Sequence, residues 1–326
     1  MTATLDSALA PQPNAAFGHR MAPAGDPLGG QAFDAIYESK IKPELVKAEQ
    51  ARQGAVRIFL AGLVLAAALV GVEVWLTGVI TEGRSSIPNT WVLIVTVFVV
   101  PFLAYIPLAG VGAKAKLAVI QALCDPIGVT YALRAKELDG YAAFLSLNLL
   151  PKNSRTTFED IFTGERAGTK FTLCNATLIQ GSGKNQRTVF QGQVFHLTTP
   201  RRLLGTTVVL RNSGWLNMFE KPKGLDSVGL EDPVFNKAFV VFGSDQVEAR
   251  EILTPVFMQE LNDLETAYKA AHLRCGFQAS EAFIAMQGKE RFGIGSLFSS
   301  LVDRARVETI ARDIEQVFTL IDRFDG

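Results

Sequence analysis

Cysteine and histidine are scarce in this sequence, which holds three residues of each type among 326. Three scattered cysteines exclude a disulfide-stabilised scaffold and fit a reducing compartment, and so few Cys and His argue against a zinc site. Net charge is also lacking, because 32 Lys and Arg balance 32 Asp and Glu. A neutral chain gives no electrostatic case for nucleic-acid binding. We therefore expect no nucleic-acid partner and no cofactor.

Recognised catalytic motifs are missing as well. The sequence has no Gly-x-Ser-x-Gly elbow and no His-Glu-x-x-His zinc helix. The run Gly181–Asn185 resembles the end of a phosphate-binding loop, but Leu178 stands where that loop needs its first glycine. Gly293–Gly295 lacks the third glycine of a dinucleotide fingerprint. We expect both glycine runs to be turns, and His196 and His272 to be structural or exposed.

Long apolar runs are what the sequence has in excess. Hydrophobic residues make up 48% of the chain, and two stretches hold most of the surplus. Residues 58–80 carry one charge, Glu73, and residues 91–112 carry none. About 20 apolar residues at 1.5 Å per residue cross a bilayer core of ~30 Å. The alternative, a pair of buried core helices, is disfavoured because core helices rarely run so long without a polar face.

The distribution of Lys and Arg predicts the orientation of these two spans. A link of ten residues joins them and forces an antiparallel hairpin, so both termini lie on one side. The link holds only Arg84, whereas cations cluster outside the hairpin: Lys40, Lys42, Lys47, Arg52 and Arg57 before it, and Lys114, Lys116, Arg134 and Lys136 after it. Cytoplasmic flanks are enriched in Lys and Arg. We expect both termini in the cytoplasm.

Three residues inside the spans have physical consequences. Pro101 and Pro107 each remove a backbone donor, so the second span is expected to kink or break there. Glu73 lies near the far end of the first span, where an ionised acid is costly. Two interpretations stay open: Glu73 is protonated or reaches water beside Trp75, or it makes a polar contact between helices or protomers.

The chain is therefore expected to divide into six parts. They are a disordered leader at 1–30, a juxtamembrane helix at 31–57, transmembrane helices at 58–80 and 91–113, an extracytoplasmic link at 81–90, and a cytoplasmic α+β domain at 114–326. The juxtamembrane helix is interrupted by Pro43 and is expected either to lie on the membrane surface or to pack on the cytoplasmic domain.

The cytoplasmic part is predicted to be α+β, with a mostly antiparallel sheet covered by helices. Residues 114–136 are expected to be mainly helical, with a break at 125–128. Residues 169–287 are β-rich, with a hairpin around 181–185 and helical residues 245–270 after a cap at Asp245. The C-terminal segment has an amphipathic helical stripe, which we expect to cover the sheet. The stripe is formed by Ile310, Ile314, Val317, Phe318, Ile321 and Phe324.

Acid pairs are the main candidates for chemistry. Glu159 and Asp160 form one pair, and Glu231 and Asp232 form another. Paired carboxylates are able to bind a metal or perform acid–base work, but they also cap helices and accept hydrogen bonds in turns. We favour the second interpretation and expect Arg250 to pair with Glu231 or Asp232.

The stretch from Leu230 to Phe239 (LEDPVFNKAF), followed by Asp245, Ala249, Arg250 and Leu253–Pro255, resembles the signature of the bacterial domain of unknown function 3137 family. Weaker matching pieces are Phe33…Ile41-Lys-Pro43…Arg52, Glu159-Asp160…Gly164 and Phe190-Gln-Gly192. The resemblance covers about residues 31–325. It implies a two-span protein of the bacterial inner membrane with a cytoplasmic domain, and it supplies no catalytic residues.

Three functions remain after this reading. The favoured one is a membrane-anchored cytoplasmic binding or scaffold domain, with the lipid bilayer and a protein partner or a second copy of the chain as its partners. The alternative is a membrane-tethered enzyme that uses the acidic residues of the cytoplasmic domain. The third is a small transporter or channel, which two spans with one acid form only as an oligomer. Interaction candidates are Glu73, Glu159, Asp160, Glu231, Asp232 and Arg250.

Overall fold

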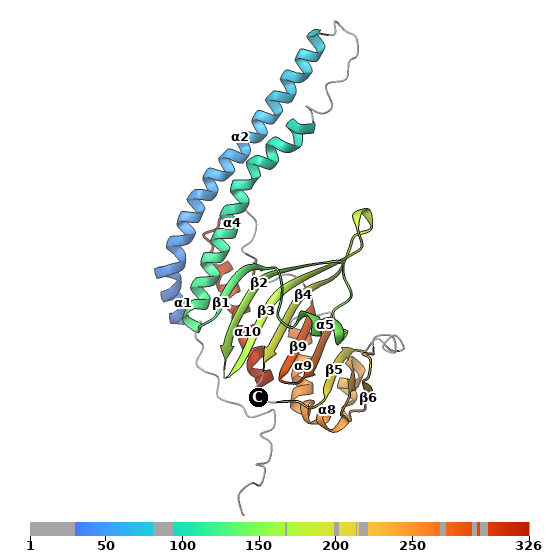
Figure 1. Cartoon of the computed structure of the whole chain (residues 1–326). Helices are drawn as coiled ribbons and strands as arrows, with labels where there is room; N and C mark the ends of the chain where they lie inside the picture. The colour runs from blue at the N-terminus through green and yellow to red at the C-terminus, as the bar shows by residue number, and fades with distance from the viewer. Residues whose placement is uncertain are drawn as a thin grey trace, which may run out of the picture.

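A long helical hairpin rises from one edge of an α+β domain in the computed structural model (Figure 1). The structure describes residues 30–80, 94–166, 168–198, 202–212, 214, 221–267, 272–288, 292–293 and 299–325. The expected leader, apart from Gly30, and the expected link at 81–90 lie outside these residues.

Two long helices form the hairpin. The first consists of α1 (Gly30–Ile36), a π-helical turn η1 (Tyr37–Ile41) and α2 (Lys42–Ile80); the second consists of the π-helical turn η2 (Val95–Val99) and α4 (Val100–Cys124). The prolines do not break either helix. Pro43 and Pro101 each follow a π-helical turn, which is one way in which a helix accommodates a missing donor and a crowded ring. Pro107 lies inside α4.

The apolar side chains of this hairpin point outward. In the most apolar 18-residue stretch of the first helix only 11% is buried within the protein, and in that of the second helix only 12%. The core helix of a soluble domain is, by contrast, mostly buried. Both helices are long and apolar enough to cross a membrane, which indicates membrane association. The two helices approach closely at Gly62, where an added Cβ would lie 2.7 Å from Ala104 Cβ. Small residues at such contacts are typical of packed helices in membranes.

A nine-stranded antiparallel sheet follows the hairpin, in the order β1-β2-β3-β4-β9-β8-β5-β7-β6. Its strands are β1 (Thr130–Ala135), β2 (Arg155–Arg166), β3 (Thr169–Gln180), β4 (Arg187–Thr198), β5 (Thr206–Arg211), β6 (Asp226–Val228), β7 (Phe239–Gly243), β8 (Leu273–Gln278) and β9 (Glu281–Gln287). The helices of this part are α5 (Tyr141–Ser146), α7 (Pro233–Ala238), α8 (Gln246–Ile252), α9 (Pro255–Ala267) and α10 (Arg304–Asp325), with 3-10 turns at η3 (Asp125–Ile127) and η4 (Gly183–Asn185). The predicted class, α+β with a mostly antiparallel sheet covered by helices, is confirmed.

The sheet begins earlier in the chain than predicted. The expected break at 125–128 is confirmed as η3 and a left-handed Gly128, but residues 130–135 form strand β1 and are not helical. Strand β2 precedes the β-rich region that the sequence indicates. Cross-strand pairing with β2 holds residues 130–135 extended, and this tertiary contact overrides their local helix propensity.

Several local predictions are confirmed. The glycine run at 181–185 is the turn of the β3–β4 hairpin. Asp245 caps α8, because its Oδ1 accepts hydrogen bonds from Val247 N at 2.8 Å and Glu248 N at 3.1 Å. Thr254 Oγ1 accepts a hydrogen bond from Phe257 N at 3.2 Å at the start of α9.

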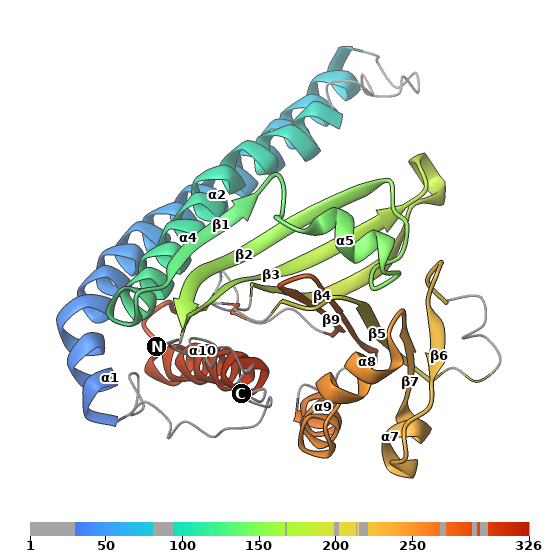
Figure 2. The same cartoon turned by 60° about the horizontal axis from the view of Figure 1, so that its bottom comes forward.

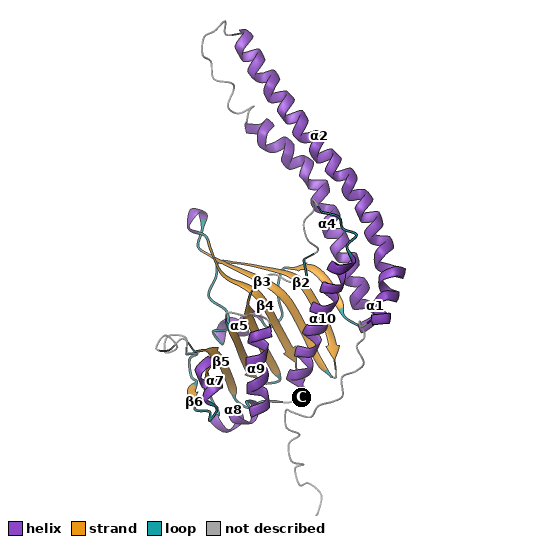
Figure 3. Ribbon diagram, turned by 180° about the vertical axis from the view of Figure 1, so that it is seen from behind, coloured by secondary structure: helices purple, strands orange, loops and turns teal. Residues whose placement is uncertain are grey.

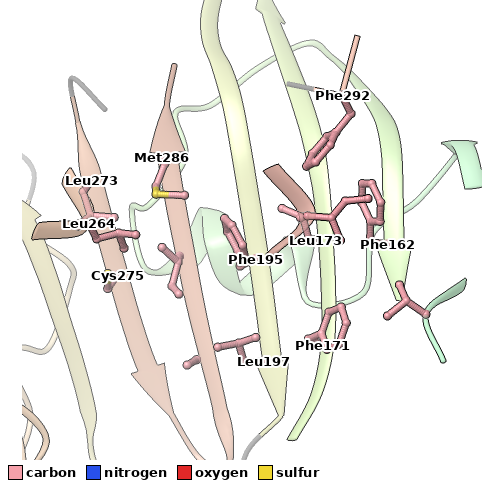
Figure 4. Packing of buried hydrophobic residues seen from close by; sticks show 14 of the residues in the cluster. Phe162, Phe171, Leu173, Phe195, Leu197, Leu264, Leu273, Cys275, Met286 and Phe292 are labelled. Atoms are coloured by element: carbon pink, nitrogen blue, oxygen red, sulfur yellow. The ribbon is translucent and has the colours of Figure 1, made fainter. Parts of the chain in front are cut away.

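Each face of the sheet has its own apolar core. α9 and α10 lie on one face and α5 lies on the other (Figure 2). On the α10 face, side chains of β2, β3, β4, β8 and β9 pack together with Phe292 (Figure 4). On the α5 face, Phe144 packs edge-on against Phe283, with ring centroids 5.2 Å apart. Two of the six residues of the C-terminal stripe, Ile310 and Ile314, have described side chains; both are buried and cover the sheet as predicted. Side chains from residue 316 onward lie outside the described part.

The juxtamembrane helix packs on the domain. Phe33, Tyr37, Ile41 and Leu45 are buried in the same core as the sheet. Figure 3 shows α10 close to the lower end of α4, with α1 beside it. Of the two expectations for this helix, packing on the domain is therefore the correct one.

Candidate functional site

Asp160 is the most unusual residue among the interaction candidates. It lies in β2, where the pairing with β3 shifts register between Glu159 and Phe162. Its φ of 54° lies in the left-handed region, which few residues other than glycine, Asn and Asp adopt. The residue is fully buried, at 0% exposure. The β-bulge thus turns a carboxylate into the protein interior, at a position that regular pairing would not give it.

Three side chains from three elements donate to this carboxylate. Lys116 Nζ of α4 lies 2.7 Å from Oδ1 and 2.8 Å from Oδ2. The hydroxyl of Tyr131 in β1 donates to Oδ1 at 2.6 Å, and Asn175 Nδ2 of β3 donates to Oδ2 at 2.9 Å. A buried charge is tolerated when it is paired and hydrogen-bonded. The Asp160 cluster, defined as these four residues, therefore joins α4 to three adjacent strands.

The protonation of neighbouring groups follows from this burial. Desolvation, reinforced by the Asp160 charge and the hydrogen bond to it, raises the pKa of the Tyr131 hydroxyl far above its usual value. Desolvation, with a further contribution from Asp160, raises the pKa of the Cys174 thiol to about 12. Both groups are therefore neutral at physiological pH, and neither is prepared to act as a nucleophile.

Glu159 points away from its neighbour and makes a surface contact. Its carboxylate accepts hydrogen bonds from Arg134 at 2.8 and 2.9 Å across the β1–β2 pair. The Arg134 side chain is largely exposed, so the pair contributes little to stability. The two adjacent acids thus have separate roles, because the bulge sends one inward and the other outward.

The second acid pair lies at the other end of the sheet and caps a helix. Asp232 Oδ1 accepts hydrogen bonds from Val234 N at 2.8 Å and Phe235 N at 3.0 Å, at the start of α7. Glu231 is exposed. The expected pair between Arg250 and these acids is wrong: Arg250 Nε donates to Gly229 O at 3.4 Å and the guanidinium contacts Gln246. The backbone carbonyl of Gly229, in the loop before the acids, takes the hydrogen bond in their place.

Glu73 lies in α2 and is half-buried, while Val72, Val74 and Trp75 around it are exposed. Its position in the apolar hairpin is as expected. Both interpretations of this acid remain predictions.

A contact that the sequence analysis missed fastens the C-terminal segment to the N-terminal helix. Glu49 Oε2 of α2 accepts a hydrogen bond from Leu301 N at 2.9 Å, and Arg52 Nη2 donates to Glu49 Oε1 at 2.6 Å. Hydrogen bonds from Arg52 and from the Leu301 backbone lower the pKa of Glu49 to about 2, against a smaller desolvation effect. The i,i+3 spacing of Glu49 and Arg52 was visible in the sequence, but their third partner is 252 residues away.

Arg304, at the start of α10, makes a second contact to the same helix. Its guanidinium bonds to Asp34 and lies 5.8 Å from the ring centre of Phe33 and 5.5 Å from that of Tyr37. A cation over aromatic faces is attracted by the ring quadrupoles. Together with Glu49, Arg304 attaches α10 to the base of the helical hairpin.

His196 is structural in its surroundings, as expected. Its ring stacks on Phe283 at 4.9 Å, and its Nε2 lies 2.9 Å from Glu281 Oε1 across the β4–β9 pair. Within the described part of the chain, no group of three or more His, Cys, Asp and Glu side chains is placed to hold a metal ion. The arrangement brings Glu159 and Asp160 to one end of the sheet and Glu231, Asp232 and Arg250 to the other, and it does not assemble them.

Comparisons with known proteins show a match to one family model. The profile of a family described as "Protein of unknown function (DUF3137)" matches residues 188–325. A search of curated proteins gave no match. Among solved structures, the crystal structure of the mycobacterial trehalose monomycolate transport factor A, TtfA, aligns with 61% of this chain and 91% of its own chain, at 12% identity and a TM-score of 0.31. At that TM-score the alignment says nothing about function. The match to this family model over residues 188–325 confirms the resemblance found in the sequence: this part of the chain is similar to the DUF3137 family of proteins of unknown function.

Proposed function

We propose that this protein is a two-span protein of the bacterial inner membrane, with both termini in the cytoplasm, whose α+β domain is held rigidly against the membrane as a binding or scaffold module. The outward-facing apolar hairpin supports the anchoring. The excess of Lys and Arg on the domain side of the hairpin, against Arg84 alone in the link, supports the orientation.

One observation carries the proposal: the membrane helices are part of the core of the domain. α2 continues from α1, whose Phe33 is buried under the domain, and α4 ends in a turn that leads directly into β1. Lys116, only two residues beyond the first flanking cation Lys114, is fixed by Asp160. A domain on a flexible linker would rotate freely, whereas this one is held at a defined orientation to the bilayer. Such a fixed orientation suits a platform for a protein partner or for a second copy of the chain.

The contacts that the candidate acids make within the domain support this function over the enzymatic alternative. The Asp160 carboxylate is occupied by three donors, and Asp232 caps α7. Both acids therefore have structural roles that account for their positions.

The anchoring and orientation are testable by protease treatment of spheroplasts that carry the full chain. We expect the C-terminal two-thirds to survive protease added outside and to be digested after lysis, and the intact protein to resist alkaline extraction from membranes. Digestion from outside, or release without detergent, would contradict the proposal.

The scaffold role needs a contact-specific test. A photoreactive residue placed at the exposed position Val247 or Val256 in the full chain should give a discrete crosslinked product in cells, and the same probe at the buried Phe235 should not. The product's mass separates self-association from a second protein. Crosslinking at neither exposed position would count against a binding surface on α8 and α9.

A further inference from the structure

We propose that the tip of the β3–β4 hairpin is a second membrane contact of this protein, and that its cations bind anionic lipid headgroups beside the helical hairpin. The tip is defined as residues 180–187. This inference rests on the proposed membrane anchoring, and it adds a lipid-binding surface in the cytoplasmic domain that is separate from the apolar spans.

The chain topology places this tip on the membrane side of the sheet. α4 descends from the span to Cys124, and the chain then reverses at Gly128, whose φ is 70°. Strand β1 then runs back up along α4. Tyr131 of β1 and Lys116 of α4 both contact the Asp160 carboxylate, which places the two elements side by side. Because the strands are antiparallel, the β3–β4 turn lies at the end of the sheet to which β1 climbs. Figures 1 and 3 both show the turn pointing in the direction in which the helices rise.

The hairpin is also long enough to reach the bilayer surface. Asn175 of β3 is at the level of Lys116, because both bind Asp160. From Asn175 to Gln180, where β3 ends, the strand advances five residues, or about 17 Å at ~3.3 Å per residue, and the turn that holds Lys184 follows it. Along α4 the first exposed cation, Lys114, lies only about 3 Å above Lys116 at 1.5 Å per residue. Even a strongly inclined strand therefore brings the tip to the plane where the span begins.

The charge of the tip and its neighbour suits an anionic surface. Lys184 and Arg187 lie in the tip, and Lys152 and Arg155 lie at the start of β2; all four side chains are exposed. Residues 151–158 and 178–192 contain no Asp or Glu, and none of the four cations forms an ion pair within the described part of the chain. Four uncompensated cations at one end of a chain that is neutral overall are attracted to anionic lipid. Each cation near the surface increases the binding constant about fivefold, which corresponds to about 1 kcal/mol.

The local structure keeps the two basic segments together. Ser154 Oγ donates to Ile179 O at 3.0 Å and to Gly181 O at 2.9 Å, which ties the start of β2 to the tip. Gly181 has a φ of 93°, and a Cβ there would lie 2.3 Å from Asn185 O, so the turn is tight. A compact turn presents its cations without a large cost of ordering on binding.

The experiment measures how close the tip lies to the lipid headgroups in the full-length protein. Single cysteines replace Thr188, next to the tip, or Thr198, at the far end of the same strand; both threonines are exposed. Each is labelled with a fluorophore, and the protein is placed in nanodiscs that carry nitroxide-labelled headgroups. One set of nanodiscs is purely zwitterionic phosphatidylcholine and the other contains about 30% phosphatidylglycerol. The native cysteines are buried and stay unlabelled.

We expect strong quenching at position 188 in anionic nanodiscs, weaker quenching in zwitterionic ones, and little at position 198 in either. The double variant K184Q/R187Q should reduce the ratio of docked to undocked tip about 25-fold in anionic nanodiscs, at about fivefold per cation. The double variant K221Q/K223Q removes the same charge near β6 and should leave quenching at 188 unchanged.

Equal quenching at 188 and 198, or quenching at 188 that depends neither on phosphatidylglycerol nor on Lys184 and Arg187, would overturn the inference. A protein that fails to enter nanodiscs at all would instead contradict the membrane anchoring itself, so the two failures are distinguishable.

Discussion

The Lys116 ammonium of the second hairpin helix lies 2.7 Å from the Asp160 carboxylate of the sheet, at the bulge of β2. The two residues are 44 positions apart in the sequence. The Lys116 side chain is 15% exposed and that of Asp160 is 1% exposed, so the pair is removed from most of the solvent. It fixes α4 to the sheet at a buried point, beside the apolar contacts of the same helix.

Breaking this pair from one side should be costly. K116M leaves the Asp160 carboxylate buried without its cation, and we expect a loss of about 3 kcal/mol or more in the free energy of unfolding. The measurement is denaturant unfolding of the full chain in detergent micelles. The variant D160N keeps a residue that tolerates positive φ, so its effect reports the charge and not backbone strain.

The double variant K116M/D160N supplies the control for this prediction. With both charges removed, no uncompensated ion remains buried, so the double variant should be more stable than K116M alone. If the effects of the two substitutions simply add, the ion pair does not couple the helix to the sheet.

The contact between Glu49 and the C-terminal segment should depend on acid pH. The folded-state pKa of Glu49 is lowered to about 2 from an ordinary value of 4.5 by hydrogen bonds from Arg52 and Leu301. A lowered pKa in the folded state means that the contribution is fully present above about pH 5 and is lost as the pH falls toward 2. We expect about 1–3 kcal/mol of stability to disappear across that window.

The variant E49Q tests this assignment, because it removes the titrating group and keeps the acceptor oxygen. Thermal unfolding of the wild-type chain and of E49Q, followed from pH 6 to pH 2.5, should differ most at the upper end of the range and converge at the lower end. Parallel curves for the two proteins would show that another group carries the acid dependence.

Part of the fold was predictable from the sequence and part was not. Apolar runs predicted the hairpin helices, and turn chemistry predicted the β3–β4 hairpin and the Asp245 cap. Strand β2 escaped detection because the bulge at Asp160 interrupts the alternation between apolar and polar residues: Phe158 and Ile161 face one side and Phe162 the other.

The candidate acids were visible, but their partners were not. Asp160 binds Lys116 across 44 residues, and Glu49 binds Leu301 across 252. Such distances in sequence are closed only by tertiary structure. Local rules did succeed where the partner is local, as for Asp245 and Asp232, and they failed for Arg250 because backbone carbonyls competed with the acids.

The three native thiols should be unreactive while the protein is folded. Cys124, Cys174 and Cys275 are buried, and desolvation raises the pKa of Cys124 and that of Cys174 to about 12. A thiol is reactive as its thiolate. We expect no modification by maleimide at pH 7.5 in native conditions and three modifications after denaturation, counted by mass spectrometry. Rapid labelling of the folded chain would show that a core region opens readily.

Gly192 should tolerate no side chain at all. It lies in β4, inside the piece Phe190-Gln-Gly192, and a Cβ there would lie 2.0 Å from Met286 O and 2.9 Å from Gln287 Cα. Both atoms belong to the backbone of β9, which cannot move aside as a flexible side chain does. G192A should therefore separate β4 from β9 and lower the free energy of unfolding by about 2–3 kcal/mol or more.

Gly288, one residue after β9, is the matched control for this substitution. An added Cβ at Gly288 meets no atom within 4 Å, so G288A should change the free energy of unfolding by less than about 0.5 kcal/mol. Both variants gain the same methyl group and lose the same backbone freedom in the unfolded chain, so the difference between them isolates the clash. Equal stability of G192A and G288A would mean that β4 and β9 are not paired as closely as the structure shows.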